Sequence, residues 1–254
     1  MVYKSPIDDF KYNLEMLEYN SFANSIDLFK DYDTETVISV VEQVAKFNEQ
    51  EMVESNKKAD REGLVYIKNG EEGPEVKTPD YFKPLYKSVV DSGYIGACNP
   101  TEYGGGGAPF AMAMLNGEVG IASNMAFYMG PGLSQGAIKA ILKKASKELK
   151  DKYLPKMIAG EWMGTMCLTE SQCGTDLGLI RTTATPEEDY FKLNGQKIWI
   201  SFGEHDLTEN IIHLVLARLP DAPEGIKGIS LFLVPKRLDD NSRNPIFCGG
   251  LEHK

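Results

Sequence analysis

The pattern of hydrophobic and polar positions changes once along the chain, near residue 160. Before that point apolar residues mostly recur at the three- and four-residue spacing of helices, whereas after it β-branched and aromatic runs alternate with turn residues. This change predicts an α+β protein with a helical domain over residues 1–160 and a β domain over residues 161–254. We expect the second domain to be mainly antiparallel and barrel-like.

Two stretches carry most of the helical prediction. Asp33 and Thr34 can cap a long helix whose apolar positions keep helical spacing as far as Phe47. Residues 109–145 are apolar nearly all round, and we expect Gly130 and Pro131 to divide them into two buried helices. The methionines of this stretch are then core residues: Met112, Met114, Met125 and Met129.

Between these helices, residues 65–80 are rich in glycine, proline and acidic side chains, and we expect a loop with short extended pieces. In the β half, "NIIHLVLARL" and "GISLFLVPK" predict buried strands, the second ended by Pro235. "FKLNGQKIWIS" (191–201) contains an Asn-Gly turn signal between two strand-like pieces. Trp199 and Ser201 then lie on one face of a strand.

Composition excludes some classes of function. A formal net charge of −10 argues against a nucleic-acid partner and against docking on an anionic membrane. No apolar run approaches the roughly 20 residues of a membrane helix, and the N-terminal residues do not form a signal peptide, so we expect a cytoplasmic protein. The four cysteines, without close CxxC spacing, are expected to be free thiols. The histidines His205, His213 and His253 have no metal-binding spacing, and we expect them at the surface or in loops, with no metal site.

Two polar loops could carry chemistry. "MCLTESQCGTDLG" (166–178) lies between strand-like flanks, and on its own it could be a side-chain-stabilised turn or a loop that holds a ligand. "NPTEYGGGGAP" (99–109) could form an anion-binding nest, but it lacks the strand-to-helix context of a dinucleotide-binding loop. We therefore favour a structural turn for the glycine-rich loop.

Four segments together resemble the flavin-dependent acyl-CoA dehydrogenases: residues 99–109, "MCLTESQCGTDLGLIRTTA" (166–184), "LNGQKIWIS" (193–201) and "GISLFLVP" (228–235). They occur in the order and spacing of that family, and the resemblance covers nearly the whole chain. The N-terminal section looks like the subfamily of longer dehydrogenases that includes 3-methylmercaptopropionyl-CoA dehydrogenase. The resemblance implies an N-terminal helical domain and a middle β domain. It also implies that the family's C-terminal helical domain, which usually supplies the glutamate base, is absent, so that the chain resembles an N-terminal half that is inactive alone.

The implied reaction is the α,β-dehydrogenation of an acyl-CoA thioester. Side chains accept hydride poorly, so the cofactor is expected to be FAD. The resemblance places the following residues at the flavin: Met166, Leu168, Thr169, Gly174, Thr175, Trp199, Ile200 and Ser201. It places Thr175, Phe127, Tyr128 and Pro131 at the substrate, where the two aromatic rings would shorten the acyl pocket or simply pack between helices. Thr175 and Ser201 depart from the serine and threonine common at these positions but keep a hydroxyl group.

The resemblance further implies an electron-transfer flavoprotein as electron acceptor and a homo-oligomer, tetramer or dimer, for the full-length protein. No residue of this chain matches the family's base motif, and Glu170 and Asp176 are expected to have structural roles. Two alternatives stay open. One is an acyl-CoA oxidase or flavin monooxygenase relative, and the other is a non-catalytic fragment that acts in binding or assembly.

Overall fold

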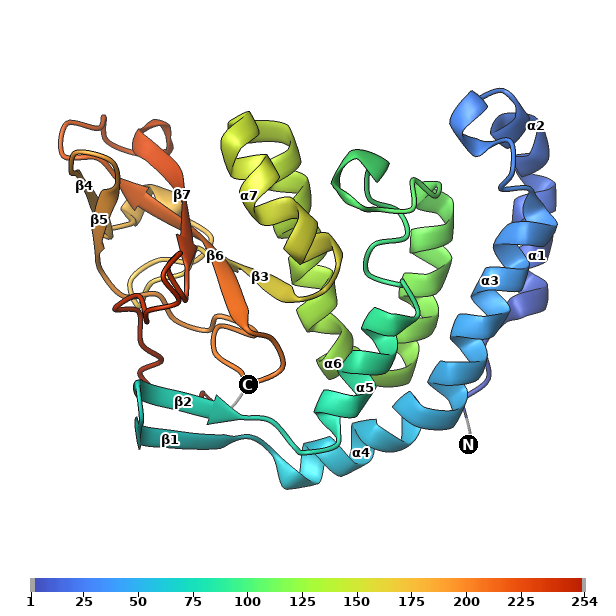
Figure 1. Ribbon diagram of the computed structural model, residues 1–254, viewed down its shortest axis with the longest axis horizontal. Coiled ribbons are helices and arrows are strands. Elements are labelled where there is room, and N and C mark those ends of the chain that lie inside the picture. Colours follow the sequence, from blue (N-terminus) through green and yellow to red (C-terminus); the bar gives the residue numbers. More distant parts are fainter. Residues whose placement is uncertain (1–2, 253–254) are drawn as a thin grey trace.

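The structure, a computed structural model, describes residues 3–252, and it confirms a helical part followed by a part that contains a sheet (Figure 1). The α-helices are α1 (Ile7–Met16), α2 (Tyr19–Asn24), α3 (Thr34–Phe47), α4 (Val53–Glu62), α5 (Phe82–Asp91), α6 (Phe110–Lys144) and α7 (Lys147–Ile158). The strands are β1 (Val65–Gly70), β2 (Gly73–Lys77), β3 (Trp162–Cys167), β4 (Thr183–Pro186), β5 (Phe191–Asn194), β6 (Asn210–Arg218) and β7 (Ile229–Pro235). After α7, the described residues contain no further α-helix.

Helix α3 begins where the sequence predicts. The Asp33 side chain accepts a hydrogen bond from the Thr36 amide at 2.8 Å, which satisfies one of the free N–H groups at the helix start. The helix continues through a π-helical turn, Asn48–Met52, directly into α4. Its apolar face packs in one buried cluster with α1, α2 and the first half of α6.

Helix α6 is kinked at Asn124, whose φ and ψ of −154° and 85° are not helical. The Asn124 side chain accepts a hydrogen bond from the Phe127 amide at 3.0 Å and donates to Ser55 Oγ at 2.8 Å. It therefore acts as an N-cap within the helix, and the backbone restarts there. The predicted break at Gly130 and Pro131 is wrong, because the helix continues through both residues.

One face of α6 is open to solvent. Met112 is buried, as predicted, but Met114, Met125 and Met129 are exposed. The prediction failed for these three because an apolar sequence on all sides of a helix does not show which side the rest of the chain will cover.

The main sheet is mixed rather than antiparallel. Its strand order is β3-β6-β4-β5, and β7 pairs antiparallel with β6. β3 and β6 pair in parallel, and β4 meets β6 through a single parallel pair. The long connection over residues 168–209 allows this crossover, which a short turn could not make. The sheet stays open, so the predicted barrel does not close.

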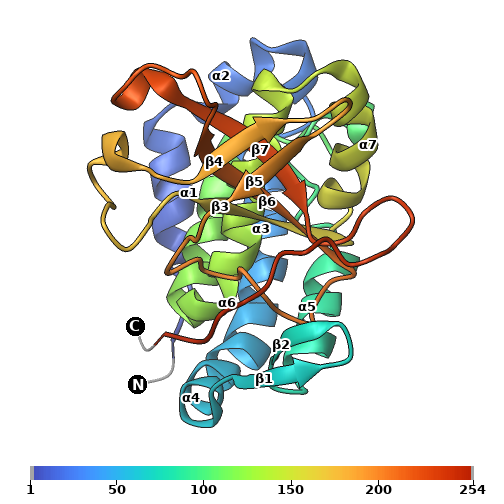
Figure 2. The same ribbon diagram turned by 90° about the vertical axis from the view of Figure 1, so that its left-hand side faces the viewer.

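The sheet lies in front of α6 and α7 when the molecule is viewed from the strand side (Figure 2). Gly164 of β3 allows the close approach: a Cβ atom added there would lie 2.6 Å from the Cβ of Ala137 on α6. The Gly164 amide also donates to Ser134 Oγ at 2.9 Å. These contacts bring the end of β3, and the loop that follows it, close to the second half of α6.

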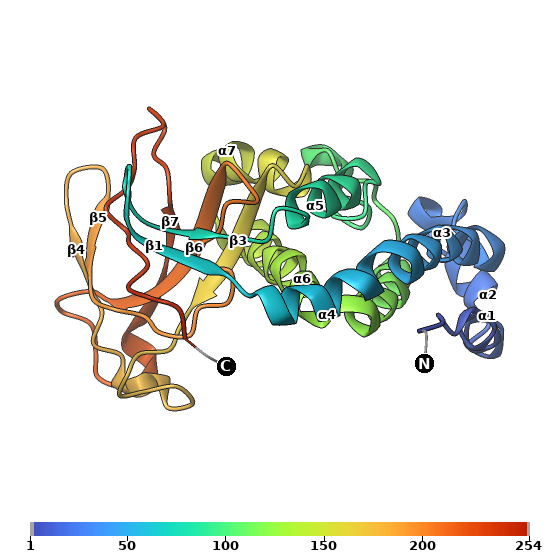
Figure 3. The ribbon, with the colours of Figure 1, turned by 90° about the horizontal axis from the view of Figure 1, so that it is seen from below.

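The short extended pieces predicted within residues 65–80 are two strands, β1 and β2, which pair as a hairpin. The hairpin extends from the helical part along the sheet to the C-terminal segment (Figure 3). Tyr66 Oη donates to the Cys248 carbonyl at 3.0 Å, and Glu72 forms an ion pair with Arg237. The hairpin therefore joins the two parts of the chain.

Candidate functional site

The loop after β3 is held in a closed shape by its own backbone. Glu170 and Cys173 exchange hydrogen bonds in both directions, at 2.9 and 3.1 Å. Asp176 accepts a hydrogen bond from the Gly178 amide at 3.1 Å and caps a short 3₁₀ turn, so it has the structural role that was expected. Met166, Leu168 and Thr169 are half-buried, whereas Gly174 and Thr175 are exposed.

The residues predicted to contact flavin form two motifs, the first within residues 166–175 and the second at residues 199–201. The second predicted motif is not a strand. β5 ends at Asn194, and Trp199 has a φ of 57°, in the left-handed region that large side chains rarely adopt. Ser201 begins a turn closed by a hydrogen bond from Gly203 N to Ile200 O, so Trp199 and Ser201 do not share a strand face. The prediction is wrong because the Asn-Gly signal ends β5 without starting a partner strand.

The structure nevertheless brings the two predicted motifs together. The Ile198 amide donates to the Thr169 carbonyl at 2.9 Å, and Lys197 Nζ donates to the Leu168 carbonyl at 3.0 Å. Residues 199–201 therefore begin directly beside residues 166–175. The sequence placed Lys197 inside the motif without giving it a role, although a lysine in so apolar a segment is a signal of a buried partner.

That partner is Glu170, which is only 5% exposed. Lys197 Nζ lies 2.7 Å from Glu170 Oε1, and the carboxylate also accepts hydrogen bonds from Gln172, from Thr182 and from the Arg181 amide. Burial alone would raise the pKa of this carboxyl group. Its hydrogen bonds, of which those from Lys197 and Thr182 have the largest effect, outweigh burial and lower the pKa to about 2. Glu170 is therefore ionised at neutral pH, and both of its carboxylate oxygens accept hydrogen bonds from the protein.

The surroundings of these motifs fit a flat aromatic group with a polar edge. Trp199 is 60% exposed, an unusual state for an indole ring. Gly174 is exposed, and a Cβ atom added there would meet nothing nearer than Thr169 Cγ2 at 3.8 Å. Thr169 and Ser201 are half-buried and Thr175 is exposed.

Three of the four predicted substrate residues lie on α6 next to the second motif and are buried, whereas Thr175 is exposed. The ring of Phe202 covers Gly130 of α6, where an added Cβ atom would lie 2.7 Å from the ring. Phe127 and Tyr128 pack with each other in a buried cluster, at 5.6 Å between ring centroids, and Pro131 is also buried. The second half of α6 and the flavin motif therefore share one region of the molecule.

The glycine-rich loop is a structural turn. The amides of Gly104, Gly105, Gly106 and Gly107 donate to the carbonyls of Thr101, Pro100, Gly96 and Asn99. These N–H groups point at the protein's own backbone and are not available to hold an anion.

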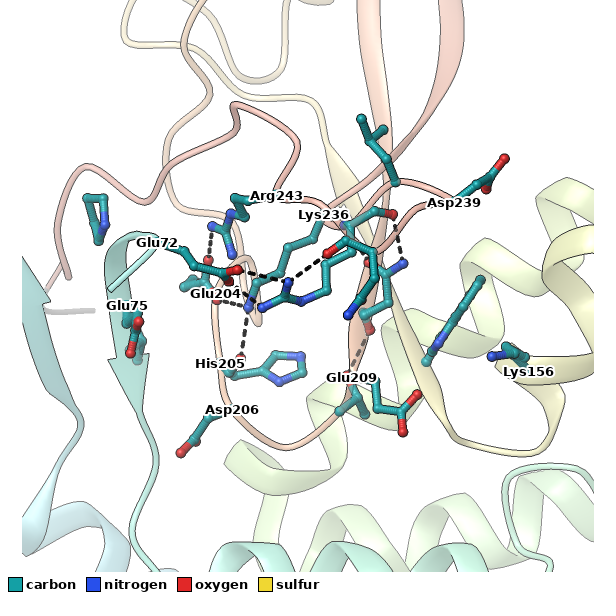
Figure 4. Close-up of a pocket in the computed structure, with 18 of the residues that line it drawn as sticks. Glu72, Glu75, Lys156, Glu204, His205, Asp206, Glu209, Lys236, Asp239 and Arg243 are labelled. Carbon is teal, nitrogen blue, oxygen red and sulfur yellow. Dashed lines mark hydrogen bonds and ion pairs between the residues drawn. The ribbon is translucent and has the colours of Figure 1, made fainter. Parts of the chain in front are cut away.

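A cavity of about 1020 Å³ opens between β2, α7 and the end of β7 (Figure 4). None of the predicted site residues lines it. Its charged side chains pair largely with one another: Glu204 with Lys236 and Arg243, Glu72 with Arg237, and Lys152 with Asp239. These pairs connect the hairpin, the sheet and α7, so the cavity belongs to the junction between the two parts of the chain.

The titratable residues outside the motifs correct one expectation. His205 lies in a loop, as expected, although it is buried, whereas His213 is buried on β6, where the expectation was wrong. His253 lies outside the described residues. Within residues 3–252, no group of three or more histidine, cysteine or acidic side chains is placed to hold a metal ion. The four cysteines are free thiols, as predicted.

Comparison with known proteins places this fold and these motifs in one class. The model of the acyl-CoA dehydrogenase N-terminal domain matches residues 34–161, and the model of the acyl-CoA dehydrogenase middle domain matches residues 165–247. The chain belongs to the acyl-CoA dehydrogenase family of flavin-dependent oxidoreductases.

Particular relatives support this assignment. The chain is 38% identical, over its whole length and 43% of the relative, to 3-methylmercaptopropionyl-CoA dehydrogenase of Ruegeria pomeroyi. It is 35% identical to a butyryl-CoA dehydrogenase of Syntrophomonas wolfei, over 94% of this chain and 40% of the relative. The crystal structure of acyl-CoA dehydrogenase from Geobacillus kaustophilus superimposes with a TM-score of 0.64 and 26% identity, over 80% of this chain and 48% of that one. The chain therefore spans about two-fifths of the length of these curated relatives.

In the part of the chain from residue 3 to residue 252, no helix is long and apolar enough to cross a bilayer.

Proposed function

We propose that this chain supplies the flavin-contacting part of an acyl-CoA dehydrogenase, with residues 1–160 as a helical domain and residues 161–254 as a β domain. The reaction is the α,β-dehydrogenation of an acyl-CoA thioester, with hydride transfer to FAD. The observation that carries the proposal is the junction of two motifs, where the Ile198 amide meets the Thr169 carbonyl at 2.9 Å and an exposed Trp199 follows.

The residues of this junction have separable tasks. Thr169, Thr175 and Ser201 offer hydrogen bonds to the polar edge and phosphates of the cofactor, while Met166, Leu168, Trp199 and Ile200 offer apolar contact to its ring. FAD, when bound, supplies the hydride acceptor that no side chain provides. The chain's part in the chemistry is to orient the ring and to exclude water from it.

The base that removes the α-proton is proposed to lie outside these motifs. A general base needs a carboxylate within hydrogen-bond reach of the substrate and a pKa near the working pH. Glu170 is saturated with donors, and Asp176 caps a turn. Both facts support a base supplied by another part of the full-length enzyme, so that the chain alone would be inactive.

The substrate is proposed to be a short acyl-CoA thioester, including a sulfur-containing one, because Phe127 and Tyr128 fill the space beside the second motif. The similarity to butyryl-CoA and 3-methylmercaptopropionyl-CoA dehydrogenases supports this choice. An electron-transfer flavoprotein as acceptor and a homo-oligomeric full-length protein complete the proposal.

Titration with FAD tests the flavin site directly. The chain has two tryptophans, so a Trp162→Phe variant leaves Trp199 as the single reporter of ring contact. We expect weak, saturable quenching of its fluorescence, since the rest of the cofactor site lies outside this chain. Absence of quenching would contradict the proposed flavin site. FAD that binds so tightly that it stays with the chain through gel filtration would contradict the proposal that the rest of the cofactor site lies elsewhere.

A further inference from the structure

The two flavin motifs are joined through one buried ion pair. Glu170 and Lys197 have side chains only 4% and 9% exposed, and their charged atoms lie 2.7 Å apart. Lys197 Nζ also donates to the Leu168 carbonyl at 3.0 Å. The lysine therefore contacts the first motif at two points, one on its backbone and one on its side chain.

The carboxylate extends the connection to a third segment. Glu170 Oε1 accepts from the Thr182 amide at 3.1 Å and its hydroxyl at 2.5 Å, and Oε2 accepts from the Arg181 amide at 2.8 Å. Residues 181 and 182 directly precede β4. One buried anion thus ties together the loop after β3, the start of β4 and the segment that leads to Trp199.

Lys197 lies two residues before Trp199, so the ion pair bears on the conformation of Trp199. The next residue, Ile198, makes the hydrogen bond to Thr169, and Trp199 follows in a left-handed conformation. A large residue keeps such a conformation only where its neighbours are fixed. The fixed neighbour on the upstream side is the residue bonded to Glu170.

We infer that Glu170 and Lys197 are positioning residues that hold Trp199 and Ser201 in register with the loop 166–175. The inference rests on the proposed function, because holding these residues in register matters for flavin binding. The contacts that hold them are present without any ligand. The pair touches no reacting atom and acts through the segments it joins.

Amide hydrogen exchange at Ile198, measured by NMR on the full chain, tests the inference without a cofactor. In Lys197→Met we expect exchange about tenfold faster, the change that corresponds to losing one hydrogen bond's net contribution to local stability. Lys197→Arg should restore slow exchange. Unchanged exchange at Ile198 in Lys197→Met would overturn the inference.

Lys236→Met is the matched control. Lys236 forms a similarly buried pair with Glu204, and Glu204 keeps the cation Arg243 as a second partner, whereas Glu170 keeps neutral donors such as Thr182. We expect slow exchange at Ile198 in this variant, and equal acceleration in both variants would overturn the inference by showing a general loss of stability. If Lys197→Met fails to fold, the neutral double variant Glu170→Gln/Lys197→Met avoids the orphaned charge and should still show fast exchange.

FAD titration of the same proteins separates this inference from the proposed function. Quenching of Trp199 that is weakened in Lys197→Met and restored in Lys197→Arg supports both. If Ile198 responds as expected but the unsubstituted chain shows no quenching, the positioning role stands and the flavin proposal falls.

Discussion

At the scale of single residues, two buried histidines set the response of the fold to acid. Burial lowers the pKa of His205 to about 3 and that of His213 to about 4, below their ordinary value of 6.5. His213 Nδ1 lies 2.7 Å from Thr165 Oγ1, so the ring has a partner in the sheet as a neutral group. The unfolded chain therefore binds protons more readily than the folded one between pH 6.5 and about 4.

We expect the melting temperature to be constant above pH 7 and to fall as the pH decreases from 6.5 toward 5, because proton uptake by the unfolded state lowers the free energy of unfolding. Glu170 does not contribute in this window, because its pKa is lowered from 4.5 to about 2 and its stabilisation is lost as the pH falls from 4.5 through about 2. The slope should be shallower in His213→Gln. A melting temperature that stays flat from pH 7 to 5 would contradict the buried, neutral state of these rings.

The sequence gives residue types at the site better than residue conformations. The hydroxyl side chains, Gly174 and Trp199 could be named from the motifs. The left-handed backbone at Trp199 could not, because it depends on Lys197 held upstream and on Phe202 packed over Gly130 downstream. Glu170 was expected to be structural, and its hydrogen-bond partners Lys197 and Thr182 became visible only in three dimensions.

At the scale of elements, the kink in α6 matters most, since this helix contacts both the helical cluster and the sheet. The kink lies opposite the π-helical turn Asn48–Met52, and Ser123 Oγ donates to Asn48 Oδ1 at 2.7 Å across the gap. Two facing distortions are therefore linked by buried polar contacts, which fix the direction of the half of α6 that carries Phe127 and Tyr128.

Asn124→Ala should destabilise the protein by about 1–3 kcal/mol, because it removes a cap acceptor and leaves buried groups of Phe127 and Ser55 without their partner. Met125→Ala is the control: its side chain is 61% exposed, so the change should stay within about 0.5 kcal/mol. Urea unfolding of both variants measures the difference. Equal values for the two would contradict the capping role of Asn124.

Elements with strong local signals were predicted, and those set by distant contacts were not. Asp33 identified the start of α3, and Pro235 the end of β7. The break in α6 was placed at Pro131 because glycine and proline are the local signals of a break, whereas the actual cause at Asn124 is a contact with Ser55 on another helix. The parallel pairing of β3 with β6 has no local signal at all.

At the scale of the whole molecule, the hairpin β1–β2 fixes the helical part against the sheet. At the base of the hairpin Thr78 donates to Asp206 from its amide at 2.9 Å and from its hydroxyl at 2.8 Å, and at its turn Glu72 forms an ion pair with Arg237. The cavity beside the hairpin is lined by residues from Glu72 to Arg243, far apart in sequence, so no pattern along the chain could reveal it. The flavin motifs lie apart from this junction, on residues the cavity does not include.

The central claim is that this chain presents the flavin-contacting residues of an acyl-CoA dehydrogenase but not the base. Loss of a general base typically lowers the rate about 10²- to 10⁴-fold even when every other group is in place. The most direct test is turnover of a short acyl-CoA by the purified chain, with excess FAD and an artificial electron acceptor. The account predicts no dehydrogenation, and measurable turnover by the purified chain would contradict it.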